Sequence, residues 1–373
     1  DKLGASLIDG LIEVTNKNVS FSGVGGPLME SAGFNSLFKM SDLSLMGLIE
    51  IIPKIPMLIS RIKLTANSII SQNPDVLITI DSPDFCMRVA KKVRNALPNL
   101  KIIHYVAPSV WAWRPERAAK MSKYVDHVLA LLPFEPPYME AEGMTCDFVG
   151  HPAVSSPHVS KKAQEKFKKK YNLHNGPIIT VLPGSRIGEI KRMCPIFNKV
   201  LNNIEKLYPD SQFILPIASS VEKDVINAVK SWNIKPLLLL NEGKDLKELE
   251  HDKFITYSIS SAALATSGTV SLELAAKKCP MIVAYKANWI TTRMVKKLAK
   301  IDTANLINII TDTKVIPEHL FENCTVENIT ESLRSLLNND NNQIKAMEET
   351  MNRLGADHKD IHLLAANSVL NNI

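Results

Sequence analysis

The strongest constraint on the fold is an apolar run at residues 76–80, Val-Leu-Ile-Thr-Ile, which leads directly into Asp81. A continuous run of apolar and β-branched residues between turn signals is typical of a buried central strand in a parallel sheet. The carboxyl ends of such strands are where α/β proteins place their functional groups. We therefore expect Asp81 to point into a crevice while Asp84 caps the next helix, with two capping carboxylates as the alternative.

The length and composition place this strand in a soluble protein of two domains. The chain has 373 residues, more than one ordinary core holds, and its 45% apolar and 22% charged residues match globular averages. The net charge of +6 favours an anionic partner. Basic residues do not alternate with aromatic ones as a base-stacking groove requires, so we expect no nucleic acid and favour phosphate groups or an anionic membrane.

The cysteines indicate the cellular compartment, and the first residues indicate how the first domain begins. The five cysteines are far apart, and none forms the C-x2-C spacing of a zinc or redox site. We interpret them as reduced core thiols of a cytoplasmic protein, and we expect neither a metal ion nor a cofactor. The chain begins with a helical pattern, and Asp1 resembles the cap of a helix whose preceding strand is missing.

Two segments near the amino-terminus predict ligand contacts. Residues 19–24 predict a short strand that runs into Gly25 and Gly26, where the backbone needs a positive φ or approaches a ligand closely. Residues 43–64 are apolar and contain Met46, but their charges and prolines exclude a membrane span. We expect this bent segment to line a site for acyl chains or to lie in a membrane interface, unless it forms a helical pair on the core.

The loop after the next predicted strand has the composition of a binding loop. Residues 101–106 predict a second buried strand, and the loop that follows contains Trp111, Trp113 and Arg114. Tryptophan and arginine side chains in a strand-end loop are hard to explain as a plain connection, so we expect this loop to bind a ligand. Residues 125–132 predict a third strand, whereas the histidine inside the second strand is expected to be structural.

A change in composition predicts the domain boundary. Residues 153–175 are rich in serine, proline and lysine, and their lysine-rich helix is expected to be a solvated face. We therefore expect a first domain at 1–152 and a second at 153–373. The helix near 350–373 is expected to pack back on the first domain.

The second domain contains two strand–turn–helix sequences that predict phosphate binding. Residues 177–182 predict a strand that is followed by Gly184, Ser185 and Arg186. Residues 262–266 predict another strand, and the residues after it are Ser267, Gly268, Thr269 and, one helical turn later, Glu273. Helix N-termini and arginine bind phosphates, and a carboxylate accepts hydrogen bonds from ribose hydroxyls. Ordinary helix capping is the alternative, and the G-x-x-x-x-G-K-[ST] spacing of a P-loop is absent.

The chain resembles the lipid-A-disaccharide synthase family in eight runs that occur in the same order, GGPLMESAG, IDSPDF, YVAPSVWAWR, LALLPFE, FVGHP, LPGSR, SGTVSLE and CPMIVAYK. This resemblance covers essentially the whole sequence. It implies an α/β protein of GT-B architecture, in which two Rossmann-like, doubly wound domains face a cleft. It also implies a metal-independent, inverting transfer of 2,3-diacylglucosamine from its UDP conjugate to the 6-hydroxyl of 2,3-diacylglucosamine 1-phosphate, with release of UDP.

The residue patterns and the resemblance together suggest a role for each residue. Asp81 is the expected base for the attacking hydroxyl group. The expected ligands of UDP and its diphosphate are Gly184, Ser185, Arg186, Ser267, Gly268, Thr269, Glu273 and Asn308. The acceptor and its acyl chains are expected at Gly25, Gly26, Met46, Trp111, Trp113 and Arg114. The sequence departs from the family at Ile307 and Phe321, and only Asp1 remains of the family's first G-E-x-S-G-D turn.

Other classes share parts of these patterns. Another GT-B UDP-sugar transferase or a UDP-sugar epimerase would contain both phosphate-binding turns. A non-catalytic, two-lobed UDP-sugar-binding protein would need no carboxylate at the strand end. The basic charge, the apolar segment and the two tryptophans also predict peripheral contact with the anionic cytoplasmic face of the inner membrane. The expected partners are the acylated sugar substrates and this membrane, and a homo-oligomer is left open.

Overall fold

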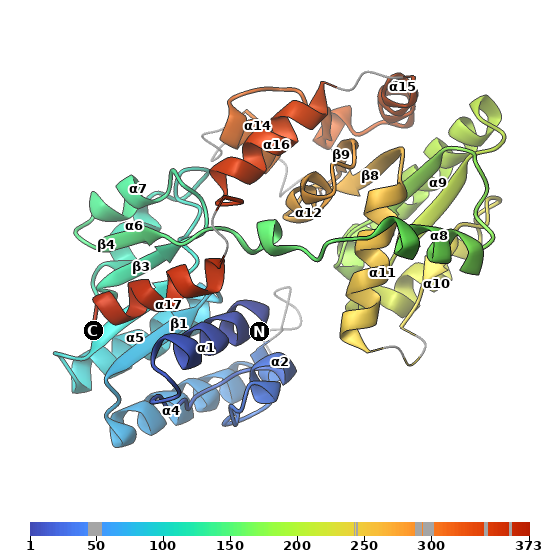
Figure 1. The fold of residues 1–373 in the computed structure, drawn as a ribbon. Coiled ribbons are helices and arrows are strands. Elements are labelled where there is room, and N and C mark those ends of the chain that lie inside the picture. The colour runs from blue at the N-terminus through green and yellow to red at the C-terminus, as the bar shows by residue number, and fades with distance from the viewer. Residues whose placement is uncertain are drawn as a thin grey trace. The chain divides into compact units, whose positions relative to one another are not determined.

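Helices alternate with parallel strands along the chain in the computed structural model of Figure 1. The structure describes residues 1–43, 54–241, 243, 245–287, 293, 302–338, 342–357 and 360–373. The expectation for Met46 therefore lies outside the described residues. The chain divides into two compact units, which we call unit 1 (Asp1–Pro152 with Leu354–Ile373) and unit 2 (Ala153–Arg353).

Unit 1 contains a parallel sheet of four described strands in the order β1-β2-β3-β4. The strands are β1 (Val76–Ile80), β2 (Lys101–Tyr105), β3 (His127–Ala130) and β4 (Thr145–Phe148). The helices are α1 (Lys2–Val14), α2 (Pro27–Ser31), α4 (Ile55–Gln72), α5 (Pro83–Ala96), α6 (Glu116–Met121), α7 (Pro136–Glu140) and α17 (Ile361–Asn371). Successive residues such as Ile102 and Ile103 point to opposite faces, where one packs with α4 and α5 and the other with α1 and α17.

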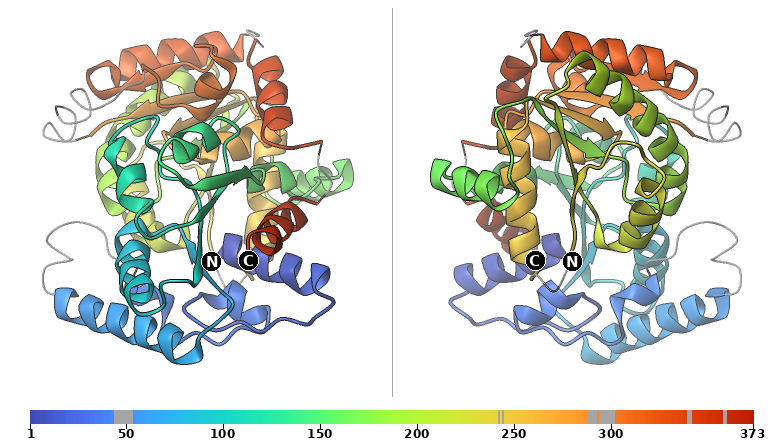
Figure 2. Two further views of the ribbon diagram at one scale, coloured as in Figure 1. Left: turned by 90° about the vertical axis from the view of Figure 1, so that its left-hand side faces the viewer. Right: turned by 90° about the vertical axis from the view of Figure 1, so that its right-hand side faces the viewer.

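Helices α1 and α17 come from the two ends of the described chain and lie side by side in Figures 1 and 2. Gly10 allows this approach, because a Cβ atom there would lie 2.5 Å from the carbonyl oxygen of His362. Leu7, Leu11 and Ala365 are buried where the two helices cover the sheet. The carboxyl-terminal helix is therefore part of the core of unit 1.

One strand prediction for unit 1 is wrong, and a second is right in its bounds but wrong in its position. Residues 19–24 form no strand, and only Gly23 makes an isolated bridge, to Ser36. β1 was expected to be central and fully buried, but it lies at the edge of the described sheet and alternates between half-buried and buried residues. A strand depends on a neighbour that supplies hydrogen bonds, and an apolar run does not reveal which neighbours are present.

The apolar segment 43–64 is described only in part, at η1 (Met40–Leu43) and from residue 54 onwards. In α4, Ile62 is buried, whereas Ile55, Ile59 and Leu64 are 42% to 46% exposed. Because Ile55, Ile59 and Ile62 are spaced by four and three residues, they lie on one face of the helix, which is exposed in the first turns of α4 and buried against the core further along. Among the described residues, no helix combines the length and the apolar character needed to cross a membrane.

Unit 2 contains a parallel sheet of six described strands in the order β10-β9-β8-β5-β6-β7. The strands are β5 (Ile178–Leu182), β6 (Gln212–Pro216), β7 (Leu237–Leu239), β8 (Ala262–Thr266), β9 (Met281–Tyr285) and β10 (Glu318–Leu320). The chain proceeds from β5 to β6 and β7 on one side, and β8 then returns to pair with the other side of β5. This reversal is a topological switch point, where parallel sheets hold ligands beyond the carboxyl ends of their strands.

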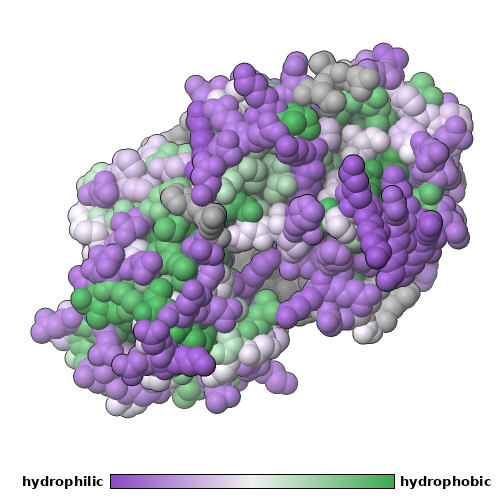
Figure 3. Space-filling view, viewed as in Figure 1, coloured by the Kyte–Doolittle hydropathy of each residue, from purple (hydrophilic) through white to green (hydrophobic). Residues whose placement is uncertain are grey.

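Helices cover both faces of this second sheet as well. They are α8 (Lys161–Lys170), α9 (Ile187–Leu207), α10 (Glu222–Val229), α11 (Leu246–Ile259), α12 (Val270–Ala276), α14 (Leu306–Thr311), α15 (Val326–Leu337) and α16 (Gln343–Arg353). Phe197 and Leu333 pack on one face, and Phe167 and Ile255 on the other. Phe167 is the only buried residue of α8, whose lysines belong to the hydrophilic surface in Figure 3. Two parallel sheets with helices on both faces confirm the predicted doubly wound α/β class.

Candidate active site

Asp81 lies at the carboxyl end of β1, where the backbone turns into α5. Asp81 and Ser82 have φ angles of 48° and 43°, a left-handed conformation that is uncommon outside glycine. The Asp81 amide donates to the Tyr105 carbonyl at 2.9 Å, which holds this turn against β2. The N-cap residue of α5 is Ser82, and Asp84 lies in the first turn, where its side chain forms no hydrogen bond with any described residue, so the prediction that Asp84 caps this helix is wrong. The strained and exposed Asp81 is the carboxylate that the turn presents.

His104 lies inside β2 and is structural, as predicted. Its side chain is 2% exposed, and its Nδ1 lies 2.8 Å from the hydroxyl of Thr79. Burial lowers the pKa of His104 to about 4, although the charge of Asp81 opposes the shift. The imidazole is therefore neutral near pH 7 and places no positive charge beside Asp81.

The loop after β2 is joined to the loop after β3 through Trp111. Its Nε1 donates to the carboxylate of Glu135 at 3.2 Å, and its ring packs edge-on against Phe134 with the ring centres 5.1 Å apart. At the start of the loop, Val106 has a φ of 85°, which is a true outlier for a β-branched residue. The Val106 amide donates to the Leu129 carbonyl at 3.0 Å. The loops that follow two neighbouring strands are thus connected through Trp111.

Glu135 is a residue that the sequence reasoning missed. It is 3% exposed, and its Oε2 accepts from the amides of Leu131 and Leu132 at 3.2 and 3.0 Å. Burial raises the pKa of Glu135 to about 7, while these amides and the Trp111 indole oppose the shift. The run LPFE after the third predicted strand was the only signal. Nothing local indicates that its glutamate reaches a tryptophan 24 residues earlier.

Trp113 and Arg114 complete this loop. Arg114 has a φ of 50°, and its guanidinium carbon lies 4.3 Å from the centre of the Trp113 ring. The guanidinium carbon of Arg117, from α6, lies 5.1 Å from the centre of the same ring. Because β2 pairs in parallel with β1, this loop and Asp81 leave the same edge of the sheet. The structure thus brings together four of the residues predicted for this half of the site.

Gly25 and Gly26 are required by packing within unit 1. A Cβ atom at Gly25 would lie 2.8 Å from the sulfur of Met29, and one at Gly26 would lie 2.6 Å from the carboxylate of Asp1. That carboxylate accepts from the amides of Leu28 and Met29, both at 3.1 Å. Asp1 was predicted to cap α1, but its side chain makes no capping bond there and caps α2 instead.

In unit 2, the turn after β5 is shaped by an internal carboxylate. Gly184 has a φ of 120°, and the Ser185 amide donates to Glu189 at 3.0 Å. Glu189 is buried in the first turn of α9 and also accepts from the Arg186 guanidinium at 3.2 Å. The Arg186 side chain is 59% exposed. In the described part of the chain, the amides of Gly184 and Arg186 donate to no acceptor and are open to a ligand.

The turn after β8 lies beside this first turn. Leu182 of β5 and Ala265 of β8 are partners in register, and the Thr266 hydroxyl donates to the Leu182 carbonyl at 3.3 Å. Gly268 and Thr269 are exposed, and within the described residues their amides have no hydrogen-bond acceptor. The two predicted phosphate-binding turns therefore meet at the topological switch point of unit 2.

Glu273 lies on α12, one turn after Thr269, and is held by a lysine that the sequence reasoning missed. Lys253 of α11 lies 3.2 and 3.1 Å from the two carboxylate oxygens of Glu273. The same ammonium group lies 4.9 Å from the centre of the Phe254 ring. Because 20 residues separate the partners, no local spacing indicates this ion pair.

The side-chain amide of Asn308 forms hydrogen bonds with other groups of unit 2. It is 1% exposed, and its Nδ2 donates to the Ile316 carbonyl at 2.9 Å and to Glu318 at 3.1 Å. Its Oδ1 accepts from the Ile316 amide at 3.0 Å. Asn308 therefore fastens α14 to the segment that leads into β10.

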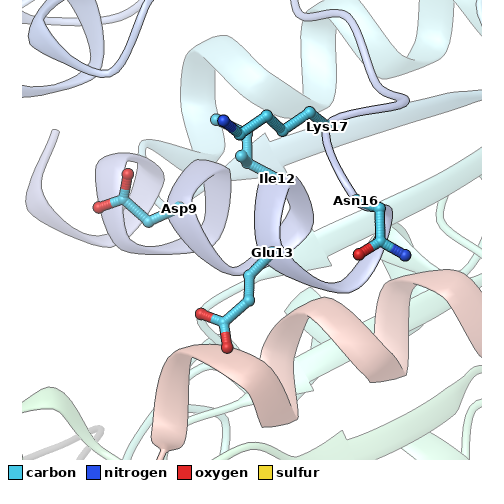
Figure 4. A pocket seen from close by; sticks show the side chains of 5 residues that line it. All are labelled: Asp9, Ile12, Glu13, Asn16 and Lys17. Carbon is cyan, nitrogen blue, oxygen red and sulfur yellow. The ribbon is translucent and has the colours of Figure 1, made fainter.

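A shallow hollow on unit 1 contains none of the predicted ligands (Figure 4). It is lined by Asp9, Ile12, Glu13, Asn16 and Lys17. These residues belong to α1 and the turn after it, and the Glu13 carboxylate lies 3.4 Å from Nε2 of His362 on α17. Among the described residues, no group of three or more His, Cys, Asp or Glu side chains is arranged to hold a metal ion.

Solved structures with a similar fold include enzymes that act on UDP-sugars. A UDP-GlcNAc 2-epimerase from Neisseria meningitidis bound to UDP-GlcNAc has a TM-score of 0.63 and 12% identity, with 99% of this chain and 95% of that chain covered. A glycosyltransferase from Rickettsia africae has a TM-score of 0.55 and 15% identity, with 99% and 92% covered. At these identities the similarity shows the fold alone.

Sequence relatives are much closer. The family described as lipid-A-disaccharide synthetase matches residues 1–371. A lipid-A-disaccharide synthase from Ruegeria pomeroyi is 44% identical over 373 residues, which are 100% of this chain and 92% of that protein. One from Rhodospirillum centenum is 40% identical over 375 residues, with 100% and 91% covered. The chain therefore belongs to the lipid-A-disaccharide synthetase family, as its motifs predicted.

Proposed function

We propose that this protein joins two acylated glucosamines by an inverting glycosyl transfer. The donor is UDP-2,3-diacylglucosamine, the acceptor is 2,3-diacylglucosamine 1-phosphate, and the products are the β-1,6-linked disaccharide 1-phosphate and UDP. Family membership supports this reaction. The single observation that best supports a UDP-binding site is the pairing of β5 with β8. This pairing places side by side two turns whose backbone amides have no acceptor among the described residues.

The nucleotide is proposed to bind at these turns of unit 2. The diphosphate accepts hydrogen bonds from the open amides of Gly184, Arg186, Gly268 and Thr269, and the exposed Arg186 guanidinium adds a cation. Donors that are already in place stabilise the charge that develops on the leaving UDP. Glu273, held by Lys253, accepts from the ribose hydroxyls. Asn308 contributes by ordering the segment that leads into β10.

The acceptor is proposed to bind at the sheet edge of unit 1. The transfer passes through an oxocarbenium-like state, so the attacking 6-hydroxyl needs a base on the face opposite the leaving group. Asp81 supplies this base, because it is exposed and held in a strained turn. Trp111 and Trp113 give the neighbouring loop the apolar surface that an acylated sugar needs. Gly25 and Gly26 contribute by seating α2 closely on Asp1.

The protein is further proposed to work at the cytoplasmic face of the inner membrane as a peripheral protein. Both substrates carry two acyl chains, and α4 exposes Ile55, Ile59 and Leu64 on unit 1. The net charge of +6 adds attraction to anionic lipid. Ile55→Glu combined with Ile59→Glu should reduce sedimentation with anionic vesicles, whereas Leu207→Glu, at a similarly exposed apolar residue of unit 2, should not. Equal sedimentation of the double variant and the wild type would refute the membrane contact.

Product analysis tests the reaction itself. The protein is incubated with UDP-diacylglucosamine and the acyl-sugar phosphate in the presence of a chelator. Disaccharide and free UDP should form together in equal amounts. An epimerised donor without disaccharide would identify an epimerase, and tight UDP-sugar binding without UDP release would identify a binding protein.

A substitution at Asp81 tests the proposed base. Asp81→Asn should lower turnover by roughly 100-fold or more and leave UDP affinity unchanged, because only proton abstraction is lost. Asp84→Asn is the matched control, since Asp84 is an exposed carboxylate three residues away that caps nothing. Near-normal turnover of Asp81→Asn would remove this residue from the mechanism.

A further inference from the structure

Two arginines of unit 1 share one tryptophan ring. The guanidinium carbons of Arg114 and Arg117 lie 4.3 and 5.1 Å from the centre of the Trp113 ring, and all three side chains are half-buried. A guanidinium group over an indole face is held by cation–π attraction and by dispersion. The ring therefore fixes two positive charges on the loop that follows β2.

These two arginines differ from the other half-buried arginines of unit 1. Arg61 pairs with Asp42 at 2.8 Å, and Arg94 pairs with Asp126 at 2.6 Å. Within the part of the chain that the structure describes, the side chains of Arg114 and Arg117 form neither an ion pair nor a hydrogen bond. Withdrawing a charge from water without a partner is costly, so a half-buried pair of like charges is suited to an anion from outside.

The arrangement suits a phosphate monoester in particular. Stacking occupies the flat face of a guanidinium and leaves its N–H groups at the edge, where they bind two oxygens of one anion. A phosphate monoester carries a charge of about −1.5 to −2 at pH 7, which two guanidinium groups can balance. Arg114 also has a left-handed backbone, with a φ of 50°, and such strain in a non-glycine residue is typical of ligand-binding positions.

The position of the pair indicates which phosphate it binds. The loop leaves β2, whose last residue, Tyr105, accepts a hydrogen bond from the amide of Asp81. Trp111 ties the same loop to Glu135, which supports the loop from within unit 1. The pair therefore belongs to the half of the site that carries the proposed base, whereas the open amides for the diphosphate belong to unit 2.

We propose that Arg114 and Arg117, held on Trp113, bind the phosphate monoester of the acceptor sugar and make the enzyme select phosphorylated acceptors. This inference rests on the proposed function and deepens it. It assigns a part of the acceptor to two named side chains, of which Arg117 is not among the residues predicted from the sequence. A phosphate group of a membrane lipid is the other source of the same chemistry.

The test compares two acceptors that differ only in the phosphate, 2,3-diacylglucosamine 1-phosphate and 2,3-diacylglucosamine, in detergent micelles. The wild type should use the phosphorylated acceptor at least about tenfold more efficiently in kcat/KM, as expected for charge-assisted hydrogen bonds. In the Arg114→Gln, Arg117→Gln variant this preference should fall to about twofold or less, with the KM for the donor unchanged. The Arg114→Lys, Arg117→Lys variant keeps both positive charges but loses the paired N–H groups of the guanidinium, so it should retain part of the preference.

Controls separate this role from a structural one. Arg88→Gln removes an exposed arginine of the same unit and should leave the preference intact. Loss of both activities in equal proportion, or an undiminished preference in the glutamine variant, would overturn the inference. It would also be overturned if the variant kept its preference but lost binding to phosphatidylglycerol vesicles, because the pair would then recognise membrane phosphate. A wild type that makes no disaccharide from either acceptor would instead refute the proposed function.

Discussion

Replacing Gly184 with alanine should distort the first phosphate-binding turn, and the structure allows the cost to be worked out. The residue has a φ of 120°, a region that side chains rarely adopt, and such strain costs roughly 1–3 kcal/mol. The added Cβ atom would also lie 2.5 Å from the Oε2 and 2.6 Å from the Cβ of Glu189. Both distances are too short for real contacts, so the glutamate has to move.

Movement of Glu189 breaks the hydrogen bond that its Oε2 accepts from the Ser185 amide at 3.0 Å. A hydrogen bond to a charged group contributes about 1.5–3 kcal/mol. Because Glu189 is buried, water cannot replace the hydrogen bond that is lost. Together the two effects predict a loss of roughly 2.5–6 kcal/mol in the free energy of unfolding. Since the same turn is proposed to hold the diphosphate, UDP affinity should fall by about tenfold or more.

Urea denaturation followed by circular dichroism measures the first effect, and titration calorimetry with UDP measures the second. Gly243→Ala is the matched control in unit 2, because Gly243 has a φ of 77° but a Cβ atom there would meet none of the described residues within 4 Å. This control should lose only the cost of backbone strain and keep its UDP affinity. If Gly184→Ala is no less stable than Gly243→Ala and binds UDP normally, the contact with Glu189 does not shape the site.

Two other substitutions test groups that the sequence reasoning missed. Burial raises the pKa of Glu135 from 4.5 to about 7, so its contribution to stability is fully present below pH 4.5 and is lost as the pH rises through 7. Glu135→Gln cannot ionise and should remove roughly 3 kcal/mol of this decline between pH 4.5 and 8 in urea denaturation; parallel pH profiles would contradict the pKa shift. Lys253→Met should weaken binding of UDP several-fold and of 2′-deoxy-UDP less, because the ion pair positions Glu273 for ribose hydroxyls. Equal losses for both nucleotides would show that Lys253 has only a structural role.

The sequence by itself determined the strands and turns whose residue preferences lie within a few consecutive positions. The apolar run at 262–266 predicted β8 with its true bounds, because five buried residues between turns have few other solutions. The turns at 184–186 and 267–269 were predicted in the same way, since glycine, serine and threonine between a strand and a helix have local conformational preferences. The family could be recognised because its motifs are short and contiguous.

Tertiary structure decided everything that depends on a distant partner. Residues 19–24 have the composition of a strand but form none, and β1 lies at an edge, because strand pairing is set by neighbours that the run itself does not encode. Only the pairing of β5 with β8 brings the two turns together, although about 80 residues separate them. Glu135 meets Trp111, and Arg117 shares the ring of Trp113 with Arg114, through contacts that exist only once the loops have folded against each other. Local preferences act along the chain, whereas packing and hydrogen bonding act through space, and the site is built from the second kind of interaction.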